Sequence, residues 1–373
     1  MASRGTLRTG LELTLSELDL GGTARAARSL QRALDARDDV QVVPVRQPGG
    51  AWAGSRGRIA RGLTRELSWL PARLARATRR MDLDVLHCPG PVVPARSPVP
   101  LVVTIFDALP WSHPQWLTWA NVASHRLVVR RAVRRADAVI TASEHAGGEI
   151  AQAYGIEPER IYVVPLGVDE VFTPGESSEE ALAELGVARP FVLAVGTLQP
   201  RKNLEAAISA FERLAADRPD LNLVIAGGGG WGERSTAERI RRSPAGDRVV
   251  LTGHVDDSQL LALYRATQCF VFPSRYEGFG LPVLEAMAAG APVVCSDRTS
   301  LPEVAGDAAT LVSPDDIEGL ERAIRRVAAS PEARAEMVER GLAQASRFTW
   351  ERCAVETVAV YRAAIAGLVG NYT

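Results

Sequence analysis

The chain has 373 residues, 46% of them hydrophobic and 23% charged, which is the composition of an ordinary folded protein and excludes disordered and fibrous chains. This length exceeds that of one typical domain and predicts two. The formal net charge of −1 argues against a general nucleic-acid-binding protein, so no nucleic-acid partner is expected.

The first ten residues, Met1 to Gly10, are polar and lack the apolar core of a signal sequence. The apolar runs of the chain are strand-sized and fall short of the ~20 residues that span a bilayer. We therefore expect a cytoplasmic protein. The four cysteines lack the spacing of a metal site, so they are expected to be buried free thiols, and no metal site is expected: Cys88, Cys269, Cys295 and Cys353.

Short apolar runs alternate with helical patterns along the first half of the chain. The first run precedes Gly21-Gly22 and a helical pattern over Ala24–Leu34, which is the strand–glycine–helix order of phosphate-binding α/β folds. Gly-Gly alone is a weak signal, because many turns contain it. The strands expected here are Leu11–Leu15, Val40–Val45, Asp84–His87, Leu101–Phe106 and Ala138–Ala142. This alternation predicts a parallel sheet with both faces covered.

A basic amphipathic stretch lies near residues 56–80. Apolar residues recur there at helical spacing from Ile59 to Met81, and eight Arg accompany the single acid Glu66. Such a helix either packs on the core of the protein with its Arg in solvent, or lies on the inner face of an anionic membrane. The abundance of Arg in the chain favours the first interpretation, and the second stays open as a peripheral membrane contact.

The second half repeats the alternation of strands and helices. The strands expected are Phe191–Val195, Leu221–Ala226, Val249–Leu251, Cys269–Phe272 and Pro292–Cys295, with helices over Leu204–Ala216, Ser258–Ala266 and Pro282–Ala289. Between the halves, Pro165–Gly175 has the composition of a linker. We expect an α/β fold of two Rossmann-like parallel-sheet domains facing across a cleft, where the carboxyl ends of the strands would bind ligands.

Arg201 and Lys202 stand between a strand end and a helix start. Lys202 is the one lysine among 43 basic residues. Because Arg serves wherever a general positive charge suffices, this lysine is a candidate functional residue. Asn203 is expected to cap the helix that begins at Leu204, and the two cations before it suit a diphosphate. The alternative is a solvated loop with two surface charges. A second glycine-rich turn, 227–230, is a weaker signal for close approach of a ligand.

Two acids bracket a third helix start. Pro282 suits the first turn of that helix, Glu277 precedes it and Glu285 lies about one turn inside it. Carboxylates accept hydrogen bonds from sugar hydroxyls, and backbone amides at a helix start hold phosphate. The simpler alternative, acids that only stabilise the helix start, does not account for Gly278 and Gly280, which clear space that a cap does not need.

These motifs resemble the donor site of the retaining family 4 glycosyltransferases (glycosyl transferases group 1), which have the GT-B fold. The resemblance covers essentially the whole chain and is most specific in the second half. It implies that Arg201 and Lys202 bind the donor diphosphate, that Glu277 lies by the donor sugar hydroxyls, and that Glu285 binds the ribose. The other donor-site positions that it implies are Gly21, Gly22, Gly196, Gly253, His254, Gly278, Phe279, Gly280 and Leu281.

One position departs from the family pattern. Many relatives carry His-Asp after the strand that ends near Ile105, whereas this chain has Phe106-Asp107. A Phe side chain cannot hydrogen-bond or carry a proton, so the contribution of that His is in doubt, and Asp107 is expected to contact the acceptor or the sugar. His87, His113 and His125 are weak candidates to replace it.

The resemblance implies an acceptor-binding domain over residues 1–172, a donor-binding domain over 173–348 and a terminal helix over 349–373 that returns to the first domain. It implies a cytoplasmic hexosyltransferase that acts with retention of configuration. The donor would be a nucleotide-diphosphate sugar, GDP-mannose before UDP-linked or glucosyl donors, and the acceptor a hydroxyl of a glycan, a lipid-linked sugar or a small molecule.

No cofactor is expected, and metal-independent transfer is expected because no Asp-rich motif adjoins the diphosphate elements. Two alternatives stay open. A non-catalytic sugar-nucleotide-binding partner subunit would explain Phe106, although binding alone does not need the whole set of Arg201, Lys202, Glu277 and Glu285. A nucleotide-sugar epimerase on the same fold would turn over without an acceptor.

Overall fold

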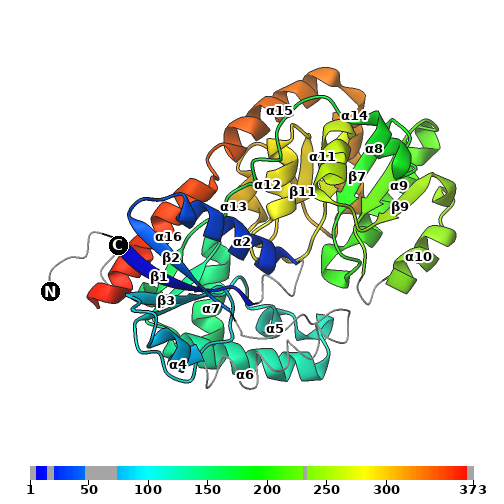
Figure 1. Cartoon of the computed structure of the whole chain (residues 1–373). Helices are drawn as coiled ribbons and strands as arrows, with labels where there is room; N and C mark the ends of the chain where they lie inside the picture. Colours follow the sequence, from blue (N-terminus) through cyan, green and yellow to red (C-terminus); the bar gives the residue numbers. More distant parts are fainter. Residues whose placement is uncertain (1–5, 15–20, 47–73, 230–232, 368–373) are drawn as a thin grey trace. The chain divides into compact units, whose positions relative to one another are not determined.

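The computed structural model describes residues 6–14, 21–46, 74–229 and 233–367 (Figure 1). The chain forms two compact units, one of Met1–Gly167 with Thr349–Thr373 and one of Val168–Phe348. The N-terminal unit is thus built from two separate pieces of the chain, and the C-terminal unit from one continuous piece.

The N-terminal unit contains a six-stranded sheet in the order β2-β1-β3-β4-β5-β6, and every neighbouring pair is parallel. All residues of β3, β4 and β5 are buried, because helices cover both faces of a parallel sheet. The strands are β1 (Leu7–Glu12), β2 (Val40–Val45), β3 (Val85–Cys88), β4 (Leu101–Thr104), β5 (Ala138–Thr141) and β6 (Ile161–Val163). Strand β1 begins four residues before the predicted strand, and β6 was not predicted.

The helices of this unit include one from the end of the chain. Among the residues that the structure describes, its α-helices with eight or more residues are α2 (Gly22–Asp35), α6 (Trp119–Arg135), α7 (Glu144–Tyr154) and α16 (Trp350–Ala366), and the short ones are α4 (Leu74–Thr78) and α5 (Leu109–Ser112). Helix α16 packs on α2, and its buried residues Ala354, Val358 and Tyr361 join Leu34 and Val102 in one apolar core. The C-terminal segment is therefore part of the N-terminal core.

The C-terminal unit contains a second six-stranded parallel sheet, in the order β12-β11-β10-β7-β8-β9. Its strands are β7 (Phe191–Val195), β8 (Asn222–Ala226), β9 (Val249–Gly253), β10 (Cys269–Phe272), β11 (Val293–Ser296) and β12 (Thr310–Val312). Its α-helices are α8 (Glu179–Glu184), α9 (Leu204–Asp217), α10 (Glu233–Arg241), α11 (Asp257–Ala266), α12 (Leu281–Ala288), α13 (Leu301–Ala305), α14 (Ile317–Ala329) and α15 (Pro331–Ala345). The prediction of two Rossmann-like parallel sheets is confirmed.

Each sheet has one point at which the strand order reverses. In the C-terminal unit this point lies between β7 and β10, which pair although they are far apart in the sequence. In the N-terminal unit it lies between β1 and β3. Open α/β sheets bind ligands beyond the carboxyl ends of the strands at such points, so these two places are where chemistry is expected.

Two further predictions concern cysteines and membranes. The four cysteines are buried free thiols, as predicted. None of the described helices is both long and apolar enough to cross a bilayer. The basic stretch near residues 56–80 lies largely outside the described residues, which resume with α4 at Leu74.

Candidate functional site

The carboxyl ends of β7 and β10 bring together the residues that the sequence singled out. Strand β7 leads into the 3₁₀ turn η4 (Pro200–Lys202), which carries both cations. Strand β10 ends at Phe272 and is followed within five residues by Glu277. Because the two strands are parallel neighbours, their loops leave the sheet at the same edge and meet there.

Glu277 is the centre of an ion cluster. Its Oε1 accepts a hydrogen bond from Lys202 Nζ at 2.7 Å, and its Oε2 accepts one from Arg201 NH1 at 3.0 Å. Ser274 Oγ donates to Oε1 at 2.6 Å. The side chains of Lys202 and Glu277 are each only 9% exposed, and the Lys202 ammonium lies 4.9 Å from the centre of the Phe272 ring. The structure thus joins the two cations that the resemblance assigns to the donor diphosphate with the carboxylate that it assigns to the donor sugar.

Burial and the neighbouring charges shift the pKa values of Glu277 and Lys202. Burial alone would raise the pKa of the Glu277 carboxyl, but the charges of Lys202 and Arg201 outweigh it and hold that pKa below its usual value of 4.5. Burial lowers the pKa of the Lys202 ammonium against the attraction of Glu277. Glu277 is therefore ionised at neutral pH, and its two oxygens order both cations.

Backbone bonds hold the two loops in register. The carbonyl of Arg201 accepts from the Arg275 amide at 2.8 Å and lies 3.0 Å from Ser274 Oγ. Arg201 NH1 also donates to the Tyr276 carbonyl at 3.2 Å. The Glu277 amide donates to Thr299 Oγ1 at 3.1 Å, so a loop after β11 supports the cluster as well. Ser274 and Thr299 were not predicted as site residues, since hydroxyl residues in loops are common.

Asn203 occupies the N-cap position of α9, as predicted, but its side chain does not bond the helix. Its backbone has a φ of 53°, and among the described residues its side chain makes no cap bond to the helix. Its amide Nδ2 donates to the carbonyls of Pro273 at 3.1 Å and Pro314 at 2.8 Å. Asn203 tolerates the left-handed conformation that the turn needs, and its side chain ties the β7 loop to two neighbouring loops.

Helix α12 begins at the second part of the site. Gly280 precedes it with a φ of 122°, and a Cβ there would lie 2.7 Å from Leu301 Cδ2, so a side chain would strain this turn. Glu285 is 4% exposed, and its Oε2 accepts a 3.4 Å hydrogen bond from the Tyr264 hydroxyl. Phe279 is buried and its ring packs edge-on against Phe348. The backbone of 278–281 is thereby fixed at the start of the helix.

The glycines after β7, β8 and β9 pack against one another. A Cβ on Gly227 would lie 2.1 Å from the carbonyl oxygen of Gly196, so the first glycine of the predicted glycine-rich turn is required by loop packing within the protein. A Cβ on Gly196 would lie 3.2 Å from Lys202 Cδ, which makes this glycine part of the Lys202 environment. Gly253 has a φ of 73°, and the exposed His254 follows it.

The remaining predicted site residues belong to the N-terminal unit. Gly21 precedes the first turn of α2 and accepts a backbone bond from Arg25 at 3.0 Å; both Gly21 and Gly22 are exposed. Asp107 follows β4, and its Oδ1 accepts a 3.1 Å bond from the Leu109 amide at the start of α5.

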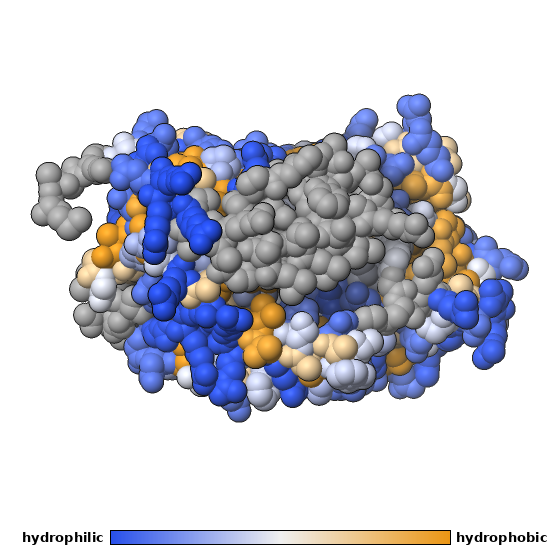
Figure 2. Space-filling view, turned by 60° about the horizontal axis from the view of Figure 1, so that its bottom comes forward, coloured by the Kyte–Doolittle hydropathy of each residue, from blue (hydrophilic) through white to orange (hydrophobic). Residues whose placement is uncertain are grey.

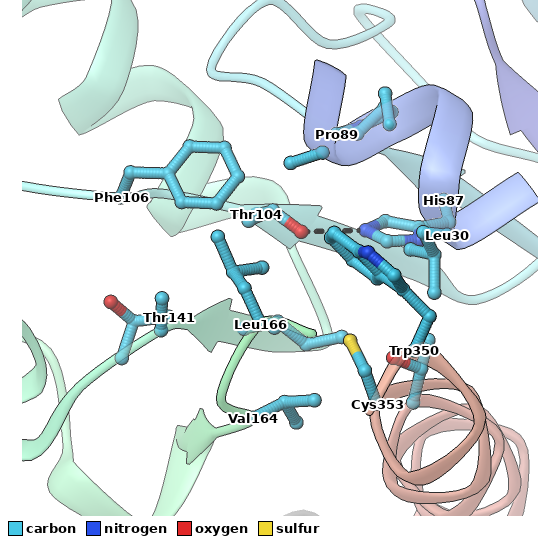
Figure 3. Close-up of a pocket in the computed structure, with 15 residues that line it drawn as sticks. Leu30, His87, Pro89, Thr104, Phe106, Thr141, Val164, Leu166, Trp350 and Cys353 are labelled. Carbon is cyan, nitrogen blue, oxygen red and sulfur yellow. Dashed lines mark hydrogen bonds between the residues drawn. The ribbon is translucent and has the colours of Figure 1, made fainter. Parts of the chain in front are cut away.

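Phe106 lines an apolar pocket at the carboxyl ends of β3, β4 and β5 (Figure 3). Leu166 and the indole of Trp350 lie on the same pocket, and His87 bonds to Thr104 beside them. The cavity volume is about 20 Å³, which is the space of about one water molecule. Phe106 thus takes part in an apolar pocket too small for a sugar.

The three histidines considered as substitutes differ in their surroundings. His87 is fully buried, its Nδ1 lies 2.8 Å from the Tyr361 hydroxyl and its Nε2 lies 2.8 Å from Thr104 Oγ1. Burial lowers its pKa to about 3, so its imidazole is in the neutral form at neutral pH. The ring of His113 stacks on Trp116, and burial lowers its pKa. His125 lies on an exposed face of α6.

Within the described ranges, no group of three or more His, Cys, Asp or Glu side chains is placed to hold a metal ion. The positive charge of the C-terminal site comes from Arg201 and Lys202. This arrangement can bind an anion with two or more oxygens through a bidentate guanidinium and a point charge.

Comparison with known proteins covers both units. The model described as Glycosyl transferases group 1 matches residues 178–344, and the model described as Glycosyltransferase Family 4 matches residues 20–172. The O-antigen chain mannosyltransferase B of Escherichia coli is 30% identical over 333 residues, which are 86% of this chain and 87% of that protein. The MMP alpha-(1->4)-mannosyltransferase of Mycolicibacterium hassiacum is 31% identical over 316 residues, 78% of this chain and 73% of that protein.

A solved structure shows the same architecture. Sucrose-phosphate synthase from Thermosynechococcus elongatus matches with a TM-score of 0.75 at 20% sequence identity, over 96% of this chain and 99% of that chain. A likeness at this level of identity concerns the fold alone. Together with the two parallel sheets, it confirms the predicted GT-B fold.

Proposed function

Because this chain belongs to the group 1 glycosyltransferases, with a family 4 N-terminal region, we propose that it transfers a mannosyl group with retention of configuration. The donor is GDP-mannose. The acceptor is a hydroxyl group of a glycan or of a lipid-linked sugar. The observation that carries the proposal is the buried cluster of Arg201, Lys202 and Glu277 at the strand-order reversal of the C-terminal sheet.

The chemistry of the cluster fits a departing nucleoside diphosphate. Glycosyl transfer breaks the bond between the anomeric carbon and the diphosphate oxygen, so negative charge grows on that diphosphate. Preorganised cations and amides stabilise such developing charge best when they are already ordered before the reaction. Arg201 and Lys202 are ordered by Glu277, and the start of α12 adds backbone amides nearby in the same unit.

Glu277 has a second proposed role toward the donor sugar. Its carboxylate is ionised, so it accepts hydrogen bonds, and the hydroxyls of a hexose can donate them. Glu285 is the proposed ribose contact, because its buried carboxylate lies inside the first turns of α12. A ligand with diphosphate, ribose and hexose then uses both cations and both carboxylates predicted for this unit.

The choice of mannose and of retention rests on relatives. The two relatives reported above are both mannosyltransferases, and one of them acts on the O-antigen chain, a glycan. Retention follows from the family resemblance. The proposed transfer needs no metal, because two cationic side chains supply positive charge for the diphosphate; activity that persists in EDTA supports this, and activity restored only by a divalent cation contradicts it.

A thermal-shift panel tests the donor site first. GDP, UDP, dTDP and ADP are added to the full chain, each alone and as its sugar conjugate. We expect GDP and GDP-mannose to raise Tm, and Lys202→Ala to remove that rise. The matched control is Arg213→Ala, an exposed cation at an ion pair of the same unit, which should keep the rise.

A transfer assay with radiolabelled GDP-mannose and a mannosylated acceptor then tests the reaction. Lys202→Ala should lower turnover roughly 10²–10³-fold with the fold intact, the scale for removing one charge-stabilising donor. Near-normal turnover of this variant contradicts the assignment. Nucleotide binding without transfer points to a partner subunit, which Phe106 would favour, and sugar turnover without an acceptor points to an epimerase.

A further inference from the structure

The segment around α6 is strongly basic and rich in tryptophan. Between Asp107 and Asp137 the chain has five Arg, two His and three Trp, and no acidic residue. The five Arg, all on α6, therefore give this part of the N-terminal unit a strong local positive charge. Neither the ion cluster of the C-terminal unit nor the proposed transfer reaction uses any of these residues.

Large apolar side chains of α6 are left in solvent. Trp119 is 84% exposed and Leu127 is 68% exposed, whereas the buried positions of the helix are Val129, Ala132 and Val133 near its C-terminal end. At about 100° per residue, Trp119, Leu127, Arg130 and Arg134 fall within one sector about 80° wide. Arg130 and Arg134 are exposed as well. Apolar and cationic side chains thus share one face of the helix.

Contacts within the unit hold this face in place. The Thr118 hydroxyl caps α6 by accepting from the Asn121 amide at 3.3 Å. Arg126 Nε donates to the Pro110 carbonyl at 3.0 Å, and its guanidinium lies 4.2 Å from the centre of the Trp111 ring. The rings of Trp111 and Tyr154 pack edge to face, which connects the segment to α7. The exposed face is therefore ordered before any partner binds.

We propose that the exposed face of α6, formed by Trp119, Leu127, Arg130 and Arg134, docks the N-terminal unit on an anionic lipid bilayer. The four side chains supply the two kinds of contact that binding to an anionic bilayer requires, electrostatic and apolar. Arg guanidinium groups pair with anionic headgroups, while Trp and Leu enter the headgroup–acyl boundary, where tryptophan is enriched. Helix α6 lies at the bottom of Figure 1, and Figure 2 brings that side forward; hydrophobic side chains lie there beside hydrophilic ones.

A bilayer fits this face better than other polyanions do. Nucleic acid would pair with the Arg residues, but its sugar-phosphate backbone offers no apolar layer for Leu127. The charge complementarity is local, since the whole chain has a net charge of −1 whereas the 29 residues between Asp107 and Asp137 hold five Arg and no acid. The proposal concerns α6 and is independent of the basic stretch near residues 56–80.

Vesicle flotation of the full chain tests the proposal without donor or acceptor, so its result does not depend on transfer. Vesicles of phosphatidylcholine alone are compared with vesicles that contain 30% phosphatidylglycerol, at low and high salt. We expect flotation on the anionic vesicles and its loss in high salt. Each Arg near an anionic surface contributes about fivefold in partitioning, so Arg130→Gln/Arg134→Gln should lower the partition coefficient about 25-fold.

Matched variants separate the face from general charge and apolarity. Trp119→Ser/Leu127→Ser should also lose flotation, whereas Arg298→Gln/Arg322→Gln and Val355→Ser, exposed positions elsewhere, should float as the native chain does. Thermal melts check that each variant is folded. A further check uses Trp119→Phe, a conservative change at an exposed position. Brominated lipid should quench the tryptophan fluorescence of the native chain more than that of this variant.

Three outcomes overturn the proposal. One is the absence of flotation on anionic vesicles. Another is equal flotation of the α6 variants and the native chain, which places membrane contact elsewhere. The third is binding of duplex DNA that the α6 variants lose while vesicle binding is unchanged, which assigns the face to a nucleic acid.

Discussion

Removing Glu277 should destabilise the C-terminal unit more than removing Lys202, although the two side chains form one ion pair. Glu277→Gln leaves two cations, one of them buried, without the carboxylate that bonds both. Lys202→Met leaves Glu277 with Arg201 at 3.0 Å and Ser274 at 2.6 Å. The two losses of stability differ because Glu277 keeps other partners when Lys202 is removed, whereas both cations lose the same carboxylate when Glu277 is removed.

The magnitudes follow from burial. Breaking a buried pair by removal of one partner costs about 3–5 kcal/mol, which we expect for Glu277→Gln. Loss of one hydrogen bond to a charged group costs about 1.5–3 kcal/mol, which we expect for Lys202→Met. The double variant removes both charges at once, so its loss of stability should fall short of the sum by about 2–3 kcal/mol.

Urea denaturation of the full chain at pH 7, followed by circular dichroism, measures the four free energies of unfolding. The control is the exposed pair Arg213 and Glu318, which bonds at 3.1 Å and whose two single substitutions should add to within about 0.5 kcal/mol. The reasoning is refuted if Glu277→Gln costs no more than Lys202→Met, or if the two changes are additive.

Three further predictions concern other parts of the chain. The pKa of His87 is about 3 in the folded chain, so below its usual value of 6.5 the unfolded chain binds a proton that the folded chain does not. The free energy of unfolding should therefore fall by about 2 kcal/mol between pH 6.5 and pH 5. His87→Gln should reduce this dependence on pH, and parallel curves for the variant and the native chain would contradict the prediction. Gly280→Ala should lower the free energy of unfolding by about 1–3 kcal/mol, because φ is 122° there, and an unchanged urea midpoint would remove the argument from strain. Glu277→Gln should show a smaller rise in Tm with GDP than the native chain does, because Arg201 and Lys202 lose the carboxylate that orders them; a larger rise would mean that Glu277 acts mainly as an anion that repels the diphosphate.

The sequence predicted the buried strands β7 and β10 more accurately than the short edge strands β6 and β12, for a physical reason. Strands β7 and β10 are buried apolar runs, and their predicted bounds are those of the structure. Strands β6 and β12 have three residues each, lie at the edges of their sheets and are only partly buried, so their sequences carry little apolar signal. In β1, Arg8, Thr9 and Gly10 interrupt the apolar run, and the predicted strand was therefore displaced toward the C-terminus.

At the site, the motifs of neighbouring residues could be predicted from the sequence, whereas the contacts between residues far apart in the sequence could not. Each motif was visible because its residues are close in sequence, and Lys202 was visible because no other lysine exists. The pairing of Glu277 with Lys202 joins positions 75 residues apart and depends on β10 lying next to β7, which the order of strands along the chain does not reveal. The close packing of Gly227 on Gly196 depends likewise on two loops meeting.

Because the N-terminal unit is built from two separate pieces of the chain, the two units are completed in a fixed order during synthesis. The C-terminal unit is continuous and has all its residues once position 348 has been made, whereas the earlier unit still lacks α16. At about 5–20 residues per second, the ribosome needs about 10–40 s to proceed from residue 167 to the end. During that time the apolar surface of the N-terminal unit that Ala354, Val358 and Tyr361 of α16 will cover stays exposed to solvent. The unit translated first is therefore finished last, and a chain released at residue 348 would carry one complete unit and one with an exposed apolar surface.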